Sequence, residues 1–241
     1  MSAGRRIVAL WSVPRSRSTA FFRMVLQRPD FQAVHEPFST LAELGSVDLG
    51  GECVRSETGV VGRLRALARE QPLFFKDTAD ERYPAVLADR AFLARDVCST
   101  FLIRDPAETI PSYYAINPDV RPEQIGFEHL HELFTLVWQV TGERPVVIDA
   151  ADLVRDPGAV VHAYFERLGL PHLPEALSWP AGDRAEWRAT GRWHRDVAET
   201  TGFEDRPSRH RLTMADLGHL RVHLERQLPF YEALREHRLT V

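Results

Sequence analysis

Residues 8–19 read V-A-L-W-S-V-P-R-S-R-S-T, and this stretch indicates how the chain is built. Its apolar half predicts a buried strand that ends at Pro14, and the spacing from Thr19 to Leu26 is that of a helix. Between them lie two arginines and three hydroxyl side chains: Arg15, Ser16, Arg17, Ser18 and Thr19. A strand that turns in this way into a helix aims backbone N–H groups and the positive end of the helix dipole at one point. We therefore expect an anion-binding site there.

Apolar runs and helical patterns alternate along the rest of the chain. Five strands are predicted at 7–11, 31–34, 73–75, 99–103 and 146–148, and helices at 19–26, 60–68, 83–93, from 107, 127–140 and 158–168. Loops are predicted at 45–62 and 171–183. A final helical pattern, 214–235, has one apolar face formed by Leu217, Leu220, Leu224, Leu228 and Tyr231. We predict an α/β fold, a single domain over residues 1–241 with a five-stranded parallel sheet flanked by helices.

Composition excludes several classes of protein. The net charge of −4 argues against a nucleic-acid or membrane-surface partner, because such proteins carry a basic face. The apolar run after Arg5-Arg6 is too short for a signal peptide or a membrane span. Cys53 and Cys98 lack metal-ligand spacing and are expected to be free thiols. These features favour a cytoplasmic protein.

Polar residues follow each predicted strand, where the ligands of a parallel sheet collect. They are Arg15–Thr19 after the first strand, His35, Glu36 and Pro37 after the second, Lys76 and Asp77 after the third, Arg104, Asp105 and Pro106 after the fourth, and Asp149 and Asp152 after the fifth. Lys76 is the only lysine among the 30 lysines and arginines. It is either retained by chance or needed for a compact ammonium group that arginine cannot replace. A place in the same site as the first motif would favour the second interpretation.

The fourth strand leads into a well-marked helix start. Asp105 is a good N-cap, Pro106 suits the first turn, and Glu108 is expected to complete a capping box. Ser112 follows two turns on, so Arg104 and Ser112 could reach one anion beside the helix. Alternatively, Arg104 only pairs with a nearby aspartate, either Asp105 or Asp77.

The two motifs together resemble those of sulfotransferases that use 3′-phosphoadenosine 5′-phosphosulfate (PAPS). Residues 14–19 are similar to the family's phosphosulfate loop, P-R/K-S-G-S/T-T. Arg104-Asp105-Pro106 with Ser112 resembles its 3′-phosphate motif. Three further segments are similar: His35-Glu36-Pro37-Phe38 to an E-P segment, 147–153 to a Y-E-D-L segment, and 190–193 to a glycine-tryptophan loop over the nucleotide. The order and spacing of the five segments are more specific than any one of them.

This resemblance implies a sulfotransferase fold of the P-loop NTPase-like type. It implies transfer of a sulfuryl group from PAPS to a hydroxyl or amine of a small-molecule acceptor, with no metal. The expected nucleotide-binding residues are Arg15, Ser16, Arg17, Ser18, Thr19, Arg104, Ser112 and Trp193. Glu36 is the preferred general base and His35 the alternative. Arg15 and Lys76 are expected to stabilise the leaving phosphate, although Lys76 could lie nearer the acceptor.

Several alternatives stay open on sequence alone. Arg17 stands where the family has glycine, so either the loop is reshaped or its side chain reaches the substrate. The chain could be a kinase or hydrolase, although it lacks the G-x-x-x-x-G-K-[ST] segment that binds phosphate in nucleotide triphosphatases. It could also be a non-catalytic nucleotide-binding protein that shares the fold. Glu36 could merely cap a turn, and His35 and Trp193 could be core residues, as Trp11 is expected to be. Asp77, Asp149 and Asp152 are expected to be caps or arginine partners.

Two further expectations concern metals and the acceptor. Late histidines such as His210 show no metal-ligand pattern. The acceptor pocket is expected to come from loops at 38–59, 116–127 and 180–209. The sequence identifies no acceptor, and whether the chain forms a homodimer is left open.

Overall fold

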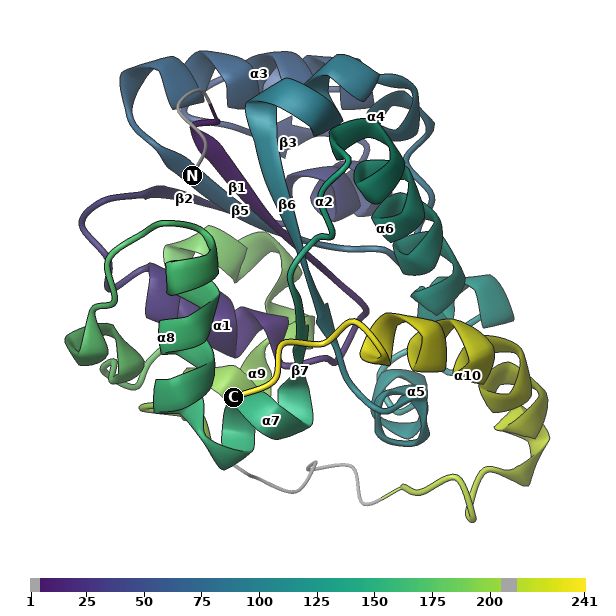
Figure 1. Cartoon of the computed structure of the whole chain (residues 1–241). Coiled ribbons are helices and arrows are strands. Elements are labelled where there is room, and N and C mark those ends of the chain that lie inside the picture. Colours follow the sequence, from purple (N-terminus) through teal and green to yellow (C-terminus); the bar gives the residue numbers. More distant parts are fainter. Residues whose placement is uncertain (1–4, 205–211) are drawn as a thin grey trace.

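Five parallel strands form the central sheet of the computed structural model, which describes residues 5–204 and 212–241 (Figure 1). Across the sheet the order is β2 (Gln32–His35), β5 (Leu73–Thr78), β1 (Ile7–Ser12), β6 (Val97–Ile103) and β7 (Val147–Asp149). Strand β1 is central, paired with β5 on one side and β6 on the other, and all six of its residues are buried. Burial on both faces explains why its sequence is a continuous apolar run. All five predicted strands are confirmed.

Helices cover both faces of this sheet. They are α1 (Ser18–Val25), α2 (Pro37–Leu44), α3 (Glu57–Glu70), α4 (Pro84–Ala88), α5 (Pro106–Tyr114), α6 (Phe127–Thr141), α7 (Ala150–Arg155), α8 (Pro157–Arg167), α9 (Arg195–Ala198) and α10 (Arg221–Arg235). Shorter helical turns are η1 (Phe92–Asp96), η2 (Pro122–Ile125), η3 (Pro174–Leu177), η4 (Ala185–Trp193) and η5 (Gly218–Leu220). Figure 1 shows α1 and α8 on one face, with α3, α4 and α6 on the other.

The core is divided by the sheet into two clusters, because successive side chains of a strand point to opposite faces. Val8 and Leu10 pack with α1 and α8. Ala9 and Trp11 pack with α2, α3 and α6, so the prediction that Trp11 is a core residue is confirmed. The apolar residues of the final predicted pattern do pack against this second cluster, but the helix expected over 214–235 begins only at Arg221, and Leu217 and Leu220 lie at the short turn before it.

Two other predicted segments also differ in detail from the structure. The expected loop at 45–62 contains a small hairpin, β3 (Val47–Asp48) with β4 (Cys53–Val54), and the start of α3. The helix expected at 83–93 ends at Ala88, because the Asp89 carboxylate accepts a hydrogen bond from the Phe92 amide and starts a new turn. Cys53 and Cys98 are free, as expected.

Within residues 5–204 and 212–241, no helix has the length and apolar character needed to cross a membrane.

Candidate active site

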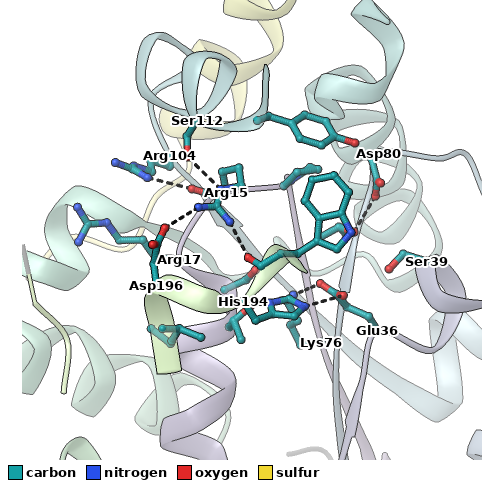
Figure 2. A pocket seen from close by; sticks show the side chains of 18 of the residues that line it. Arg15, Arg17, Glu36, Ser39, Lys76, Asp80, Arg104, Ser112, His194 and Asp196 are labelled. Carbon is teal, nitrogen blue, oxygen red and sulfur yellow. Dashed lines mark hydrogen bonds and ion pairs between the residues drawn. The ribbon is translucent and has the colours of Figure 1, made fainter. Parts of the chain in front are cut away.

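A cavity of about 590 Å³ opens at the carboxyl edge of the sheet (Figure 2). Among the residues predicted for the site, the cavity is lined by Arg15, Arg17, Ser18, Thr19, Glu36, Lys76, Arg104, Ser112 and Trp193. Ser16 and His35 are buried outside this lining. The parallel strands bring these residues together because all of their carboxyl ends meet at one edge.

The turn after β1, here called the arginine loop (residues 14–19), contains two residues with left-handed backbone. Arg15 has φ 63° and Arg17 has φ 70°, and the latter is the N-cap of α1. Such a conformation costs a residue with a Cβ about 1–2 kcal/mol. Arg17 therefore keeps the backbone that a glycine would adopt, while its guanidinium donates to the Glu204 carbonyl at 2.6 Å. Its side chain also lines the cavity.

Arg15 is the centre of the cationic end of the cavity. Its Nε donates to the Ser112 hydroxyl at 2.9 Å, its Nη1 to the Trp193 carbonyl at 2.6 Å, and its Nη2 pairs with Asp196 at 3.0 Å. Burial lowers the pKa of Arg15, although the Asp196 carboxylate acts against this. Arg104 donates to the carbonyl of Arg15 at 3.0 Å, so the two predicted motifs lie in contact.

The start of α5 confirms one prediction and corrects another. The Asp105 carboxylate accepts from the Ala107 amide, as an N-cap should. Glu108 does not complete the expected capping box: its carboxylate pairs with Arg104 at 2.6 Å. The neighbouring guanidinium is a stronger donor than a neutral backbone amide. The carboxylate that pairs with Arg104 is therefore that of Glu108, and not that of Asp105 or Asp77 as the sequence suggested.

Glu36 and Lys76 form a buried ion pair at the other end of the cavity. Glu36 ends β2 in a left-handed conformation, φ 43°, and is the N-cap of α2 without a side-chain cap bond. Its carboxylate contacts the Lys76 ammonium, which also donates to the Thr19 hydroxyl at 3.4 Å. Burial alone would raise the pKa of Glu36, but Lys76 and the imidazoles of His35 and His194 lower it well below the usual value. The single lysine therefore lies in the same site as the first motif, between the arginine loop and Glu36.

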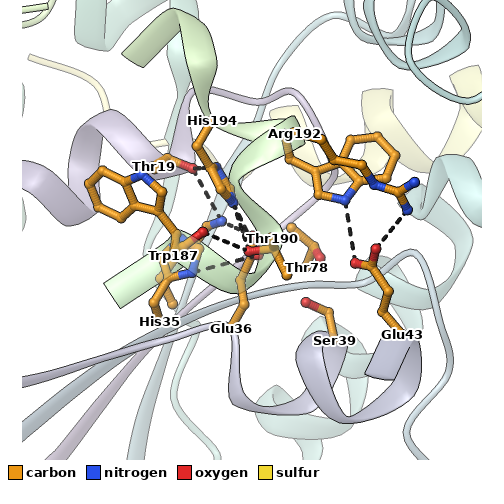
Figure 3. Close-up of polar contacts among 12 residues, drawn as sticks. Thr19, His35, Glu36, Ser39, Glu43, Thr78, Trp187, Thr190, Arg192 and His194 are labelled. Carbon is orange, nitrogen blue, oxygen red and sulfur yellow. Dashed lines mark hydrogen bonds and ion pairs between the residues drawn. The ribbon is translucent and has the colours of Figure 1, made fainter. Parts of the chain in front are cut away.

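His194 is the site residue that the sequence analysis missed. It follows η4 directly, is 5% exposed, and lies 3.6 Å from Glu36 and 3.1 Å from the Thr19 hydroxyl (Figure 3). The glycine-tryptophan segment 190–193 ends one residue before it. No spacing in the chain connects this histidine with β2, so only the fold shows that they meet.

His35, the alternative base, lies behind the cavity wall. Its ring packs 5.0 Å from Phe22 and 5.5 Å from Trp187. Burial lowers its pKa well below 6.5. The observed surroundings are those of a packed core histidine.

The donor atoms of His35, Glu36 and His194 lie within 4.8 Å of one another, close enough to hold a metal ion. Two imidazoles and a carboxylate are a known ligand set for divalent transition metals. However, the Lys76 ammonium contacts the same carboxylate and supplies the positive charge that a metal ion would bring. His210 lies outside the described residues.

The remaining cavity wall is more acidic and aromatic. Trp193 lies 5.5 Å from the Tyr113 ring, and its indole N–H donates to Glu43. Burial raises the pKa of Asp80 to about 6, and the Thr78 hydroxyl donates to it at 2.6 Å. Residues from the segments 38–59, 116–127 and 180–204 line the cavity, those of the first segment from helix α2 and not from a loop.

The other aspartates have structural partners, as predicted. Asp77 accepts from the Phe38 and Ser39 amides at the start of α2. Asp149 caps α7 and pairs with Arg235. Asp152 pairs with two arginines, Arg155 and Arg238.

Comparison with known proteins gives the same assignment as the motifs. The model of the sulfotransferase domain family matches residues 5–238. Two Arabidopsis thaliana proteins named branched-chain-amino-acid aminotransferase-like protein 1 and 2 are 30% and 28% identical over 96% of this chain. The chain spans only 42% of the length of each of these relatives.

Two solved structures are also similar. They are the sulfotransferase domain from the curacin biosynthetic pathway (TM-score 0.47, 18% identity) and that from the Synechococcus PCC 7002 olefin synthase (TM-score 0.46, 19% identity). Each match covers 73% of this chain and 78% of the other. Since the family model spans nearly the whole chain and the motifs that define the cavity lie within it, this chain belongs to the sulfotransferase domain family.

Proposed function

We propose that this chain transfers a sulfuryl group from PAPS to a hydroxyl or amine of a small-molecule acceptor. The proposal rests on one observation, that the two ends of a single cavity differ in their charged groups. Arg15, Arg104 and Ser112 converge at one end, and the Glu36–Lys76 pair lies at the other, with Thr19 between them. The cationic end suits an anionic donor, and the end at Glu36 suits an acceptor that must lose a proton.

The cationic end fits the phosphates of the nucleotide. Arg15 and Arg104 are fork-shaped donors suited to phosphate, and the Ser112 hydroxyl points to the same place (Figure 2). The Asp196 carboxylate already pairs with Arg15, which indicates that this guanidinium accepts an anionic partner. Trp193 lines the cavity beside them and offers a ring for the adenine.

The chemistry then assigns two tasks. The acceptor attacks sulfur in line, the sulfur–oxygen bond to the 5′-phosphate breaks, and the electron pair goes to the phosphate oxygen. Arg15, Lys76 and the amides at the start of α1 would stabilise that developing charge. On the attacking side, a group near Glu36 would take the proton of the acceptor. Much of the 590 Å³ cavity would be filled by the nucleotide, which favours a small acceptor.

The test combines binding and product analysis. The desulfated nucleotide, 3′-phosphoadenosine 5′-phosphate (PAP), should bind without Mg²⁺ in a calorimetric titration, and acceptors incubated with PAPS should gain the mass of one SO₃ group. Arg104→Ala should weaken PAP binding by about tenfold or more, since a charged hydrogen bond contributes about 1.5–3 kcal/mol. Arg221→Ala, which removes an exposed guanidinium on α10, is the matched control and should bind normally. Absence of PAP binding by the parent protein contradicts the proposal.

A further inference from the structure

His194 stands where the arginine loop and Glu36 come closest, and the reaction as written above gives it no task. Its ring lines the cavity between η4 and α9 (Figure 3). Nδ1 lies 3.1 Å from the Thr19 hydroxyl, while Nε2 lies 3.6 Å from a Glu36 oxygen and 3.4 Å from the Thr190 hydroxyl. Both ring nitrogens therefore face groups of the site.

These partners determine which nitrogen can accept a proton. An ionised carboxylate only accepts hydrogen bonds, so the hydrogen of the neutral ring belongs on Nε2, toward Glu36. Nδ1 then has the free electron pair and faces Thr19, a residue of the arginine loop. The Thr19 oxygen accepts from the Lys76 ammonium at 3.4 Å, so Thr19 can donate its hydrogen to Nδ1, and the acceptor would take over that contact when it binds. The basic nitrogen thus faces Thr19, which lies between the cationic end of the cavity and the Glu36–Lys76 pair.

Glu36 itself is a poor proton acceptor in this arrangement. It contacts the Lys76 ammonium, and its lowered pKa makes the carboxylate a weak base. Burial lowers the pKa of His194, an effect that Glu36 partly offsets, so the direction of the shift favours the neutral ring, whose Nδ1 has no proton of its own. His35 has similar chemistry but does not line the cavity.

We propose that His194 is the general base of the transfer and that Glu36 orients its ring and stabilises the imidazolium. This assignment rests on the proposed function. As the bond from the acceptor oxygen to sulfur forms, the oxygen's proton passes to Nδ1 of His194. The sulfur–oxygen bond to the 5′-phosphate breaks with its electrons remaining on the phosphate, and the proton later leaves to water. A histidine held by a carboxylate in this way is a recurrent catalytic pair.

The experiment compares two acceptors that differ in their need for a base. Phenol resembles the tyrosine side chain, with a pKa of about 10, and must lose its proton during attack. 4-Nitrophenol is a much stronger acid that is already partly ionised in neutral solution, so it has little need of a base. His194→Gln should slow PAPS consumption with phenol by about a hundredfold or more and with 4-nitrophenol by less than about fivefold. A merely structural role for His194 would slow both reactions equally.

Two accompanying measurements separate binding and pairing from the chemical step. The Kd for PAP should be unchanged in His194→Gln, and His194→Asn checks that the result does not depend on one replacement. Glu36→Gln should lose less than His194→Gln, and the double variant should be no slower than His194→Gln, because the residues act as a unit. His162→Gln, an exposed histidine on α8, should behave like the parent.

The acidic limb of kcat/KM against pH should report the protonation of His194 and be absent from His194→Gln. The charged and titratable groups around this ring are Glu36, Lys76, His35 and Arg15. Glu36→Gln removes the carboxylate that favours the imidazolium, so it should move the limb to lower pH. If the limb survives in His194→Gln and disappears in Glu36→Gln, the base is Glu36 and the inference is wrong.

Two other outcomes are equally decisive. If the parent protein neither binds PAP nor consumes PAPS with phenol, 4-nitrophenol or water, the proposed function fails and the inference with it. If PAP binds and transfer occurs but chelators abolish it and Zn²⁺ restores it, then His35, Glu36 and His194 are metal ligands. That result overturns the inference alone.

Discussion

Arg15 and Arg17 hold backbone conformations that few residues with a Cβ adopt. The strain persists because each guanidinium is fixed at its far end, Arg15 by Ser112 and Asp196, and Arg17 by the Glu204 carbonyl. A side chain thus stabilises a turn in which glycine would need no such support. The same two guanidiniums are among the cations that line the cavity.

Arg17→Gly and Arg17→Ala should separate backbone strain from charge. Alanine keeps the strain and loses the contact to Glu204, whereas glycine relieves the strain. We therefore expect Arg17→Gly to be more stable than Arg17→Ala by about 1 kcal/mol in urea unfolding. Both variants should bind PAP more weakly than the parent, to a similar degree. Equal stability of the two variants would show that the left-handed backbone at this position carries no cost.

Buried histidines should make the protein sensitive to acid. The pKa values of His35 and His194 are lowered mainly by burial, so the unfolded chain binds protons more readily than the folded chain below about pH 6.5. The free energy of unfolding should therefore fall with decreasing pH below that point, by at most about 1.4 kcal/mol per pH unit for each ring. Denaturant unfolding between pH 5 and 8 measures this slope, and His35→Asn should reduce it. An unchanged slope in that variant would count against a buried neutral ring at position 35.

At the scale of elements, the segment from η4 to Glu204 lies across the arginine loop. The Trp193 carbonyl and Asp196 contact Arg15, the Glu204 carbonyl contacts Arg17, and Arg192 pairs with Glu43 across the cavity. An irregular segment far along the chain thereby completes a site begun by the first strand. Its carboxylate at Asp196 pairs with the guanidinium that the proposed donor needs.

Asp196→Asn should therefore strengthen nucleotide binding. The substitution removes a negative charge that competes with the phosphates for Arg15, and a partly exposed ion pair of this kind contributes about 1 kcal/mol or less. The Kd for PAP should decrease by up to about fivefold in a calorimetric titration. Asp119→Asn, at an exposed turn, serves as the control. Weaker binding by Asp196→Asn would instead mean that Asp196 positions Arg15 for the nucleotide.

At the scale of the whole molecule, the site joins the two halves of the core. The arginine loop leads into α1 on one face of the sheet, and Glu36 leads into α2 on the other. A ligand that contacts both should stabilise folding as a whole, because it binds only where the two faces are correctly placed on one sheet.

PAP should raise the melting temperature without added Mg²⁺. At 100 times its Kd, a ligand specific for the folded state adds about 2.7 kcal/mol, which corresponds to about 5–10 °C for a chain of this size. Differential scanning fluorimetry over a range of PAP concentrations measures the shift. Arg104→Ala should show a smaller shift at equal PAP, and the same shift in both proteins would argue against Arg104 as a nucleotide contact.

The sheet and the cationic end of the cavity could be predicted from sequence because their signals are local. Continuous apolar runs mark the buried strands, and Asp105-Pro106 marks the start of α5. The position of His194 beside Glu36 could not be predicted, since it depends on how a late irregular segment folds back over the sheet. Nor could the partner of Glu108, because a capping box and an ion pair with Arg104 fit the same spacing.

The burial of Lys76 has a consequence for chemical labelling. This chain has one lysine side chain, and it is 1% exposed at the floor of the cavity. Reagents that acylate amines find no exposed lysine side chain on the folded protein, so they cannot label it through surface lysines. By contrast, a nucleotide analogue that carries an aldehyde where the sulfuryl group would be has a single lysine to react with. One modified peptide, identified by mass, would then mark the point at which donor and acceptor meet.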